Sequence, residues 1–148
     1  MKSRRVLVID DDAEVCTLVA RTLTRAGYEV LTAQTGEAGL SLLDVGPVEC
    51  LVVDKMLPGM HGGEVIGEAR SRFPGIPVVL ISGHSEPLSF GEQRPDVTLG
   101  KPFKSLAAIE EAVSEAIASR TGVSPVESLK ERLTQVVAEI APLRRKRE

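Results

Sequence analysis

The sequence predicts an α/β fold, a doubly wound five-stranded parallel sheet with helices on both faces. Two observations carry this prediction. Short apolar runs that end at polar residues recur five times, and stretches with helical periodicity separate them. Apolar runs without alternation are typical of strands buried on both faces, and strands that alternate with helices favour parallel pairing through right-handed crossovers.

The composition is that of one ordinary globular domain. The chain has 148 residues, of which 43% are hydrophobic and 26% charged, enough to bury a core. The net charge of −3 and the scarcity of aromatic residues argue against nucleic-acid binding. No stretch has the length of a signal peptide or a membrane span. Cys16 and Cys50 stand in apolar stretches, so we expect reduced core thiols in a cytoplasmic protein.

The first strand is expected over residues 5–10, and it ends in the acidic run Asp10, Asp11 and Asp12. The helix after it ends at Gly27, a residue typical of the position just past a helix. Its apolar stripe, spaced as one helix face requires, consists of Val15, Leu18, Val19, Thr22, Leu23 and Ala26.

The second strand is expected over residues 28–33, and Thr35 is placed to cap a helix that closes near Gly46. The third strand, residues 50–54, ends at Asp54, where Pro and Gly residues turn the chain outward. A helix is expected from about 63 to 73. Its inward residues are Val65, Ile66 and Ala69.

The fourth strand is expected over residues 77–82. Residues 83–95 contain two prolines and show weak periodicity, so any fourth helix there should be short or irregular. A short fifth strand covers residues 97–100, and Ser105 is placed to cap the helix after it. The residues of that helix expected to face the core are Leu106, Ile109, Val113, Ala116 and Ile117.

Polar residues stand at the ends of four strands: Asp10 and Asp11, Asp54, Ser82 and Lys101. The carboxyl ends of parallel strands share one edge of the sheet, where ligands gather. Three carboxylates at one place repel each other unless a cation joins them, and Mg²⁺ is the cation that best suits oxygen ligands. Lys101 and the Ser82 hydroxyl can hold phosphoryl oxygens. The set therefore predicts phosphoryl transfer onto Asp54.

These motifs resemble the receiver domain of two-component response regulators. The resemblance covers about residues 4–119, with four motifs in the family's order. They are Val6-Leu-Val-Ile-Asp-Asp-Asp12, Val52-Val-Asp-Lys-Met-Leu-Pro-Gly-Met-His-Gly62, Val78-Val-Leu-Ile-Ser-Gly83 and Lys101-Pro-Phe103. The fold that this resemblance implies is flavodoxin-like, with strand order 2-1-3-4-5.

The resemblance also implies a role for each site residue. Asp54 would accept a phosphoryl group from a phosphohistidine on a sensor histidine kinase or a histidine phosphotransfer protein. Asp10 and Asp11 would hold Mg²⁺ together with Asp54 and the main-chain carbonyl of Met56.

Two further residues complete the implied site. Ser82 would be the switch hydroxyl and Lys101 the phosphoryl-binding lysine, followed by a cis peptide bond to Pro102. Such a protein catalyses only its own aspartyl phosphorylation and dephosphorylation, and is otherwise no enzyme.

The sequence departs from the family in two respects. Thr98 stands where an aromatic residue is usual, and the interval between Ser82 and Lys101 is short. Both features are similar to those of receivers attached to hybrid histidine kinases. They argue against the usual output surface of the family, which is formed by the fourth helix, the fifth strand and the fifth helix.

We expect a receiver domain over residues 1–119, followed over 120–148 by a linker, an amphipathic helix and a basic tail. The helix would begin at a capping box near Ser124. Its apolar stripe is Val126, Leu129, Leu133, Val136, Ile140 and Leu143. The stripe is short for a coiled coil and must bury against something. Three possibilities stay open: a homodimer through residues 124–143, folding back onto the domain, or docking on another protein.

Function is expected to follow from phosphorylation state, passed on by protein contact without nucleic acid or membrane. About 30 residues after the receiver are too few for an ordinary output domain. The alternative is a vestigial receiver that acts as a phosphorylation-independent interaction or dimerisation module, although the intact site argues against it. Met56 stands where a phosphatase of similar fold would need a second acid, and flavin-binding loops are absent from the sequence.

Overall fold

In the computed structural model, which describes residues 4–83 and 94–121, five parallel strands form one sheet of order β2-β1-β3-β4-β5. The strands are β1 (Arg5–Ile9), β2 (Glu29–Ala33), β3 (Cys50–Asp54), β4 (Val78–Gly83) and β5 (Val97–Lys101). The helices are α1 (Ala13–Arg25), α2 (Gly36–Leu43), α3 (Gly62–Arg72) and α4 (Leu106–Thr121). The predicted fold and strand order are confirmed. The predictions for residues 84–93 and 124–143 lie outside the described residues.

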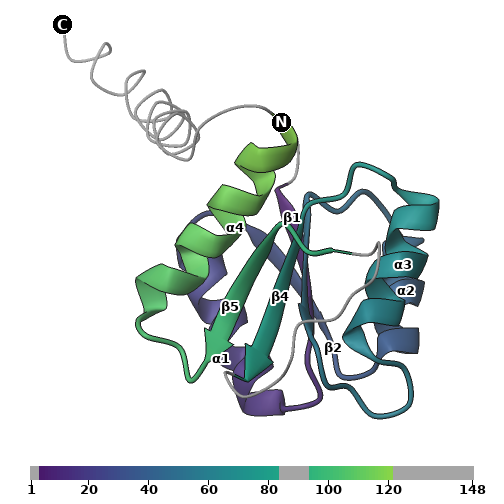
Figure 1. The fold of residues 1–148 in the computed structure, drawn as a ribbon. Helices are drawn as coiled ribbons and strands as arrows, with labels where there is room; N and C mark the ends of the chain where they lie inside the picture. Colours follow the sequence, from purple (N-terminus) through teal and green to yellow (C-terminus); the bar gives the residue numbers. More distant parts are fainter. Residues whose placement is uncertain (1–3, 84–93, 122–148) are drawn as a thin grey trace, which may run out of the picture.

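The sheet separates two hydrophobic cores, and Figure 1 shows helices on both of its faces. α1 and α4 pack on one face, where the inward side chains of β1 are Val6 and Val8. α2 and α3 pack on the other face, against Leu7 and Ile9. Since alternate residues of β1 enter opposite cores and are fully buried, the strand reads as an uninterrupted apolar run.

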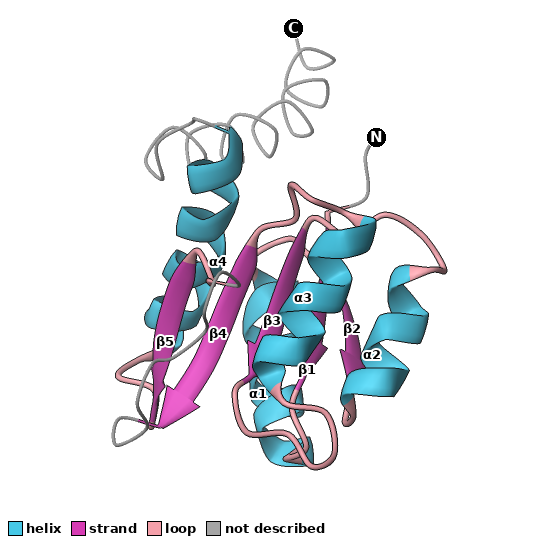
Figure 2. Ribbon diagram, turned by 45° about the vertical axis from the view of Figure 1, so that its right-hand side comes forward, coloured by secondary structure: helices cyan, strands magenta, loops and turns pink. Residues whose placement is uncertain are grey.

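The predicted caps set the starts of two helices. The Thr35 hydroxyl accepts a hydrogen bond from Ala38 N (3.1 Å), and the Ser105 hydroxyl accepts one from Ala108 N (3.1 Å). These bonds satisfy amide groups that have no partner within the helix. Figure 2 shows the strands ending at the same edge of the sheet, which is where the candidate site residues were expected.

Two residues predicted to face the core do not. Leu18 of α1 is 38% exposed and Leu106 of α4 is 49% exposed. Leu106 is the first residue of its helix, beside the loop from β5. Leu18 borders the buried stripe of Cys16, Val19 and Leu23. It therefore lies at the margin of the buried face of α1, where the sheet does not cover it.

Asp96 joins three elements at the opposite end of the sheet from the candidate site. Its carboxylate accepts hydrogen bonds from Arg70 Nη2 of α3 (3.0 Å) and Arg120 Nε of α4 (2.9 Å). It also accepts one from Val78 N at the start of β4 (2.8 Å). The Asp96 side chain is only 12% exposed, so these bonds operate where water competes weakly.

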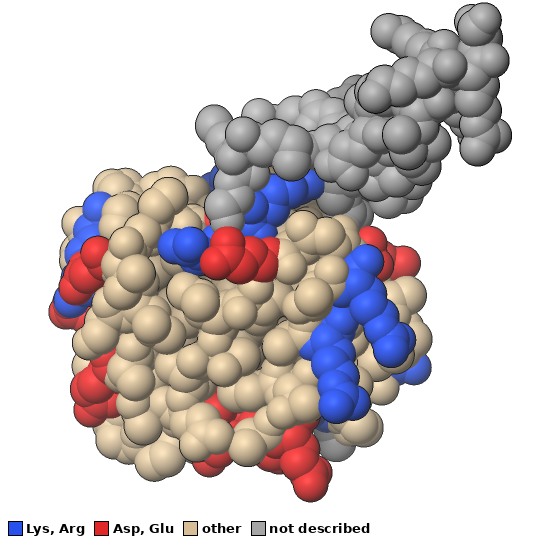
Figure 3. Space-filling view, turned by 180° about the vertical axis from the view of Figure 1, so that it is seen from behind, with Lys and Arg blue, Asp and Glu red and all other residues tan. Residues whose placement is uncertain are grey.

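Charge is distributed unevenly over the surface. In Figure 3, one group of acidic side chains lies at the lower end of the molecule, the end toward which the strands point in Figure 1, and others lie on the left flank and the upper rim. Among the described helices, none combines the length and the apolar character that crossing a bilayer requires. The predicted cytoplasmic location stays a prediction.

Candidate functional site

Neighbouring strands place the two central carboxylates side by side. Asp10 follows β1 directly and Asp54 ends β3. The strands pair in parallel with Ile9 opposite Val53, so the next residue of each strand reaches the same edge. Asp10 is fully buried and Asp54 is 7% exposed. Two acids so little exposed require a partner cation to stay ionised.

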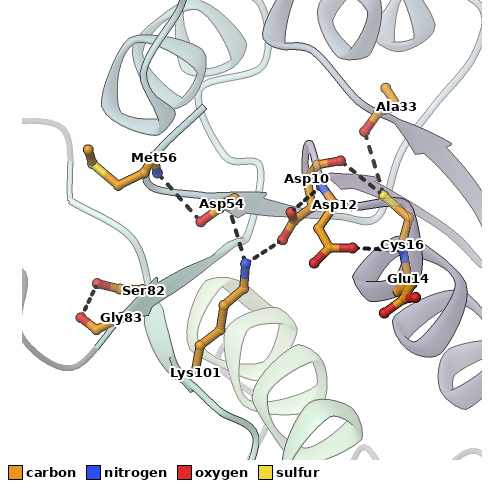
Figure 4. A network of polar contacts seen from close by, with 10 residues as sticks. All are labelled: Asp10, Asp12, Glu14, Cys16, Ala33, Asp54, Met56, Ser82, Gly83 and Lys101. Atoms are coloured by element: carbon orange, nitrogen blue, oxygen red, sulfur yellow. Dashed lines mark hydrogen bonds and ion pairs between the residues drawn. The ribbon is translucent and has the colours of Figure 1, made fainter. Parts of the chain in front are cut away.

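Lys101 supplies positive charge from the edge strand β5. Its Nζ atom lies 3.0 Å from Asp10 Oδ2 and 3.5 Å from Asp54 Oδ2 (Figure 4). The ammonium group therefore lies against both carboxylates. The Lys101–Pro102 peptide bond that follows is cis, as the resemblance implied.

Three carboxylates form a cluster that suits a divalent cation. One oxygen from each of Asp10, Asp11 and Asp54 lies within 4.8 Å of the others. Asp10 Oδ1 accepts a hydrogen bond from Asp12 N (2.9 Å). Asp10 Oδ2 is buried, and although it faces the charge of Lys101, it receives no well-directed hydrogen bond from the described residues. An all-oxygen set with such an atom fits Mg²⁺, which prefers carboxylates and retains several waters.

The pKa of Asp54 reflects this crowding. Burial, followed by the negative charge of Asp10, raises it from 3.8 to about 6, although Lys101 acts in the opposite direction. For Lys101, burial alone would lower the pKa, but the nearby negative charges of Asp10 and Asp54 outweigh burial, so the pKa is raised. At neutral pH Asp54 is thus mainly ionised and Lys101 charged, the forms that phosphoryl chemistry needs.

The loop after Asp54 is held close beneath the site. A Cβ atom on Gly62 would lie 2.5 Å from the Asp54 carbonyl oxygen and 2.8 Å from Lys55 Cα, so only glycine fits there. Gly62 N donates to Lys55 O (2.9 Å). Gly59 has a φ of +80°, a conformation that L side chains rarely adopt. The Pro- and Gly-rich motif therefore fixes where α3 begins relative to Asp54.

Ser82 and Met56 lie at the same edge with different orientations. The Ser82 hydroxyl is buried and donates to the Gly83 carbonyl (3.1 Å) (Figure 4). Met56 N donates to Asp54 Oδ1 at 3.5 Å, and the Met56 side chain is 53% exposed. The structure thus brings Asp10, Asp11, Asp54 and Lys101 together. The metal-ligand role of the Met56 carbonyl stays a prediction.

One contact of the site was not predicted. The Cys16 thiol, in the first turns of α1, donates to Asp10 O (3.2 Å) and lies 3.8 Å from Ala33 O. Burial, and then the charge of Asp10, raises the pKa of Cys16. The thiol thus supports the backbone that carries Asp10. The sequence identified Cys16 as a core residue, but the spacing of Cys16 from Asp10 did not reveal which groups it would contact.

Comparison with known proteins agrees with this geometry. The family model described as the response regulator receiver domain matches residues 6–113. The chain is similar to the probable transcriptional regulatory protein TcrX of Mycobacterium tuberculosis, 32% identical over 131 residues that cover 83% of this chain and 53% of TcrX. It is also similar to the alkaline phosphatase synthesis transcriptional regulatory protein PhoP of Bacillus subtilis, 32% identical over 57% of this chain and 35% of PhoP. The chain therefore spans about half, or less, of the length of these two relatives.

Solved structures show the same fold. A response regulator receiver protein from Sinorhizobium medicae superposes with a TM-score of 0.72 at 31% identity, over 80% of this chain and 98% of that one. Chemotaxis response regulator CheY4 of Vibrio cholerae gives a TM-score of 0.71 at 25% identity, over 78% and 99%. With the family model matched over most of the strands and helices, this chain belongs to the response regulator receiver domain family of two-component systems.

Proposed function

We propose that the protein accepts a phosphoryl group on Asp54 and signals through protein contacts that depend on this modification. The observation that carries the proposal is the position of Lys101 Nζ, which lies against the carboxylates of both Asp10 and Asp54 at the strand ends. Two buried acids joined to one lysine form a costly arrangement for stability alone, but they suit a group that must gain and lose a phosphoryl charge.

The reaction follows from these residues. An oxygen of the Asp54 carboxylate attacks phosphorus as the bond from phosphorus to the donor histidine nitrogen breaks, and the electron pair of that bond leaves with the imidazole. The Lys101 ammonium turns from the carboxylates toward a phosphoryl oxygen. Asp10, Asp11, Asp54 and the Met56 carbonyl would hold Mg²⁺, which neutralises phosphoryl charge when bound. The Ser82 hydroxyl, which now donates to Gly83, would rotate to donate to the phosphoryl group.

The donor is expected to be a sensor histidine kinase or a histidine phosphotransfer protein, as the family implies. The activity is confined to the protein's own phosphorylation and dephosphorylation. Because the chain spans only part of the matched relatives, the response that follows phosphorylation is itself a proposal: contact with another protein, without nucleic acid or membrane, in the cytoplasm.

The direct test is incubation with Mg²⁺ and acetyl phosphate, followed by intact-mass measurement. We expect a gain of one phosphoryl group that requires Mg²⁺ and is absent from the Asp54→Asn variant. Circular dichroism would show that this variant is folded. An unmodified wild-type protein, under conditions that phosphorylate an established receiver domain, would contradict the proposal.

A further inference from the structure

An open apolar groove of about 700 Å³ lies beside the candidate site, between α1 and the segment that joins β5 to α4. Its apolar walls are formed by Val15 and Leu18 of α1 together with Phe103 and Leu106. Leu18 and Leu106, the two leucines that were expected in the core, are 38% and 49% exposed. Two large aliphatic side chains exposed in one groove indicate a surface that another segment covers.

The chain itself supplies a segment with the right apolar pattern. The last described helix, α4, ends at Thr121, and the sequence continues for 27 residues to Glu148. Within that continuation, apolar residues recur every three or four positions from Val126 to Leu143. This spacing predicts an amphipathic helix whose stripe needs a partner surface.

Length and direction match the groove. α4 has 16 residues, about 24 Å of helix, and a helix over 125–141 would be about 25 Å long. Residues 122–124 can span about 10 Å, which is the usual separation of packed helices. A helix that runs back antiparallel to α4 would therefore bring the last part of the stripe to Leu106 and Leu18.

Charge favours the same direction. The antiparallel path brings the basic residues 144–147 to the end of the groove that is bordered by the exposed acids Asp12 and Glu14. A group of acidic side chains is visible at that end in Figure 3. Opposite charges would thus meet at this end of the groove, so the acidic residues and the basic tail are complementary.

We propose that residues 125–143 fold back into this groove between α1 and the segment that joins β5 to α4, with residues 144–147 beside Asp12 and Glu14. The competing occupant is the same segment of a second copy. A tether of three residues holds the segment at an effective concentration of about the millimolar range. The stripe is also shorter than the three to four heptads of a convincing coiled coil. The proposal does not depend on phosphorylation of Asp54, and it implies that the segment borders the approach to Lys101, which also lines the groove.

Limited trypsin digestion of the full chain tests the proposal, with fragments identified by mass spectrometry. Lys130 and Arg132 lie in the middle of the segment, and a packed helix protects its bonds from cleavage. We expect Leu18→Asp and Leu106→Asp to accelerate cleavage at these two residues by about tenfold, because cleavage follows the population of the open state. Val45→Asp, which replaces a 71% exposed residue far from the groove, should leave the rate unchanged.

The remaining outcomes are decisive. In the wild type the rate should not vary with protein concentration, and sedimentation velocity should show a monomer. Equal cleavage rates in Leu18→Asp, Leu106→Asp and Val45→Asp would overturn the proposal and leave the groove to another protein. A dimer that persists in Leu18→Asp but dissociates in Leu133→Asp would also overturn it, and would assign the stripe to a second copy. Circular dichroism shows whether each variant is folded, and two groove variants guard against the failure of one.

Discussion

Asp54 is the proposed phosphoryl acceptor, and it is also a carboxyl whose ionised form is disfavoured by its surroundings. Its burial and the adjacent Asp10 raise its pKa to about 6, while Lys101 and, when bound, a divalent cation favour its ionised form. The acid that reacts is thus one whose charge the folded protein without metal tolerates poorly. This conflict predicts a pH-dependent effect of removing the charge.

We expect Asp54→Asn to stabilise the metal-free protein at pH 7.5. A carboxyl whose pKa is raised from 3.8 to about 6 on folding favours the folded state fully below pH 4, and this contribution is lost as pH rises through 6. Asn avoids that loss, so the free energy of unfolding should be about 1–3 kcal/mol higher than for the wild type. Urea unfolding with chelator at pH 7.5 and pH 4 measures the difference, which should shrink at pH 4.

Glu37→Gln is the control, because Glu37 is exposed on α2. It should change the free energy of unfolding little at either pH. An Asp54→Asn variant that is less stable than the wild type at pH 7.5 would show that the ion pair with Lys101 outweighs the burial of Asp54.

At the scale of elements, the two ends of the sheet carry different kinds of polar contact. The carboxyl ends of β1, β3 and β5 carry the acids and the lysine, with ionic contacts that can be exchanged. At the amino ends, Asp96 connects α3, α4 and β4 through three hydrogen bonds. The candidate site and the junction at Asp96 therefore lie at opposite ends of the sheet.

Removal of the Asp96 side chain should destabilise the folded protein. We expect Asp96→Ala to lower the free energy of unfolding by about 2–4 kcal/mol, because it removes the acceptor of three hydrogen bonds, from Arg70, Arg120 and the Val78 amide. Asp44→Ala is the matched control, since Asp44 also pairs with an arginine, Arg72, but its side chain is 66% exposed. It should cost under about 1 kcal/mol. Urea unfolding compares the two, and equal effects would remove Asp96 from this role.

The helices show how far local patterns lead. The caps at Thr35 and Ser105 were predicted, because a hydroxyl before an amphipathic run is a local signal. The exposure of Leu18 and Leu106 was not, because spacing identifies the apolar face of a helix but not the width of the surface that covers it. The hydrogen bond from Cys16 to Asp10 also depends on how two elements meet in space, which no local pattern contains.

For the whole molecule, a parallel sheet and the meeting of Asp10, Asp11, Asp54 and Lys101 could be predicted, because apolar runs that end at acids or lysine mark parallel strands and their shared edge. The strand order was predicted from the resemblance to receiver domains alone. The orientation of the Ser82 hydroxyl toward Gly83 could not, since a hydroxyl chooses among nearby acceptors. The same assembly would make the proposed metal binding a property of the whole fold, because Asp10 and Asp54 come from separate strands and meet only when the sheet forms.

Mg²⁺ should therefore stabilise the entire domain. At tenfold the dissociation constant, a ligand bound only by the folded state adds about 1.4 kcal/mol, which corresponds to a rise in Tm of several degrees in a domain of this size. Thermal unfolding with MgCl₂, against NaCl of equal ionic strength, measures the shift. Asp11→Asn, at an exposed member of the carboxylate cluster, should reduce it strongly, whereas Asp44→Asn should retain it. A shift of equal size in both variants would exclude the carboxylate cluster as the binding site.

The burial of Cys16 and Cys50 has a practical consequence. Both thiols are almost inaccessible, with exposures of 5% and 0%, and burial raises the pKa of each. Alkylating reagents need the accessible thiolate, so these cysteines can react only when the domain opens. They are therefore built-in probes of opening: the rate of labelling at Cys16 reports on α1 and the support of Asp10, and the rate at Cys50 reports on the centre of the sheet.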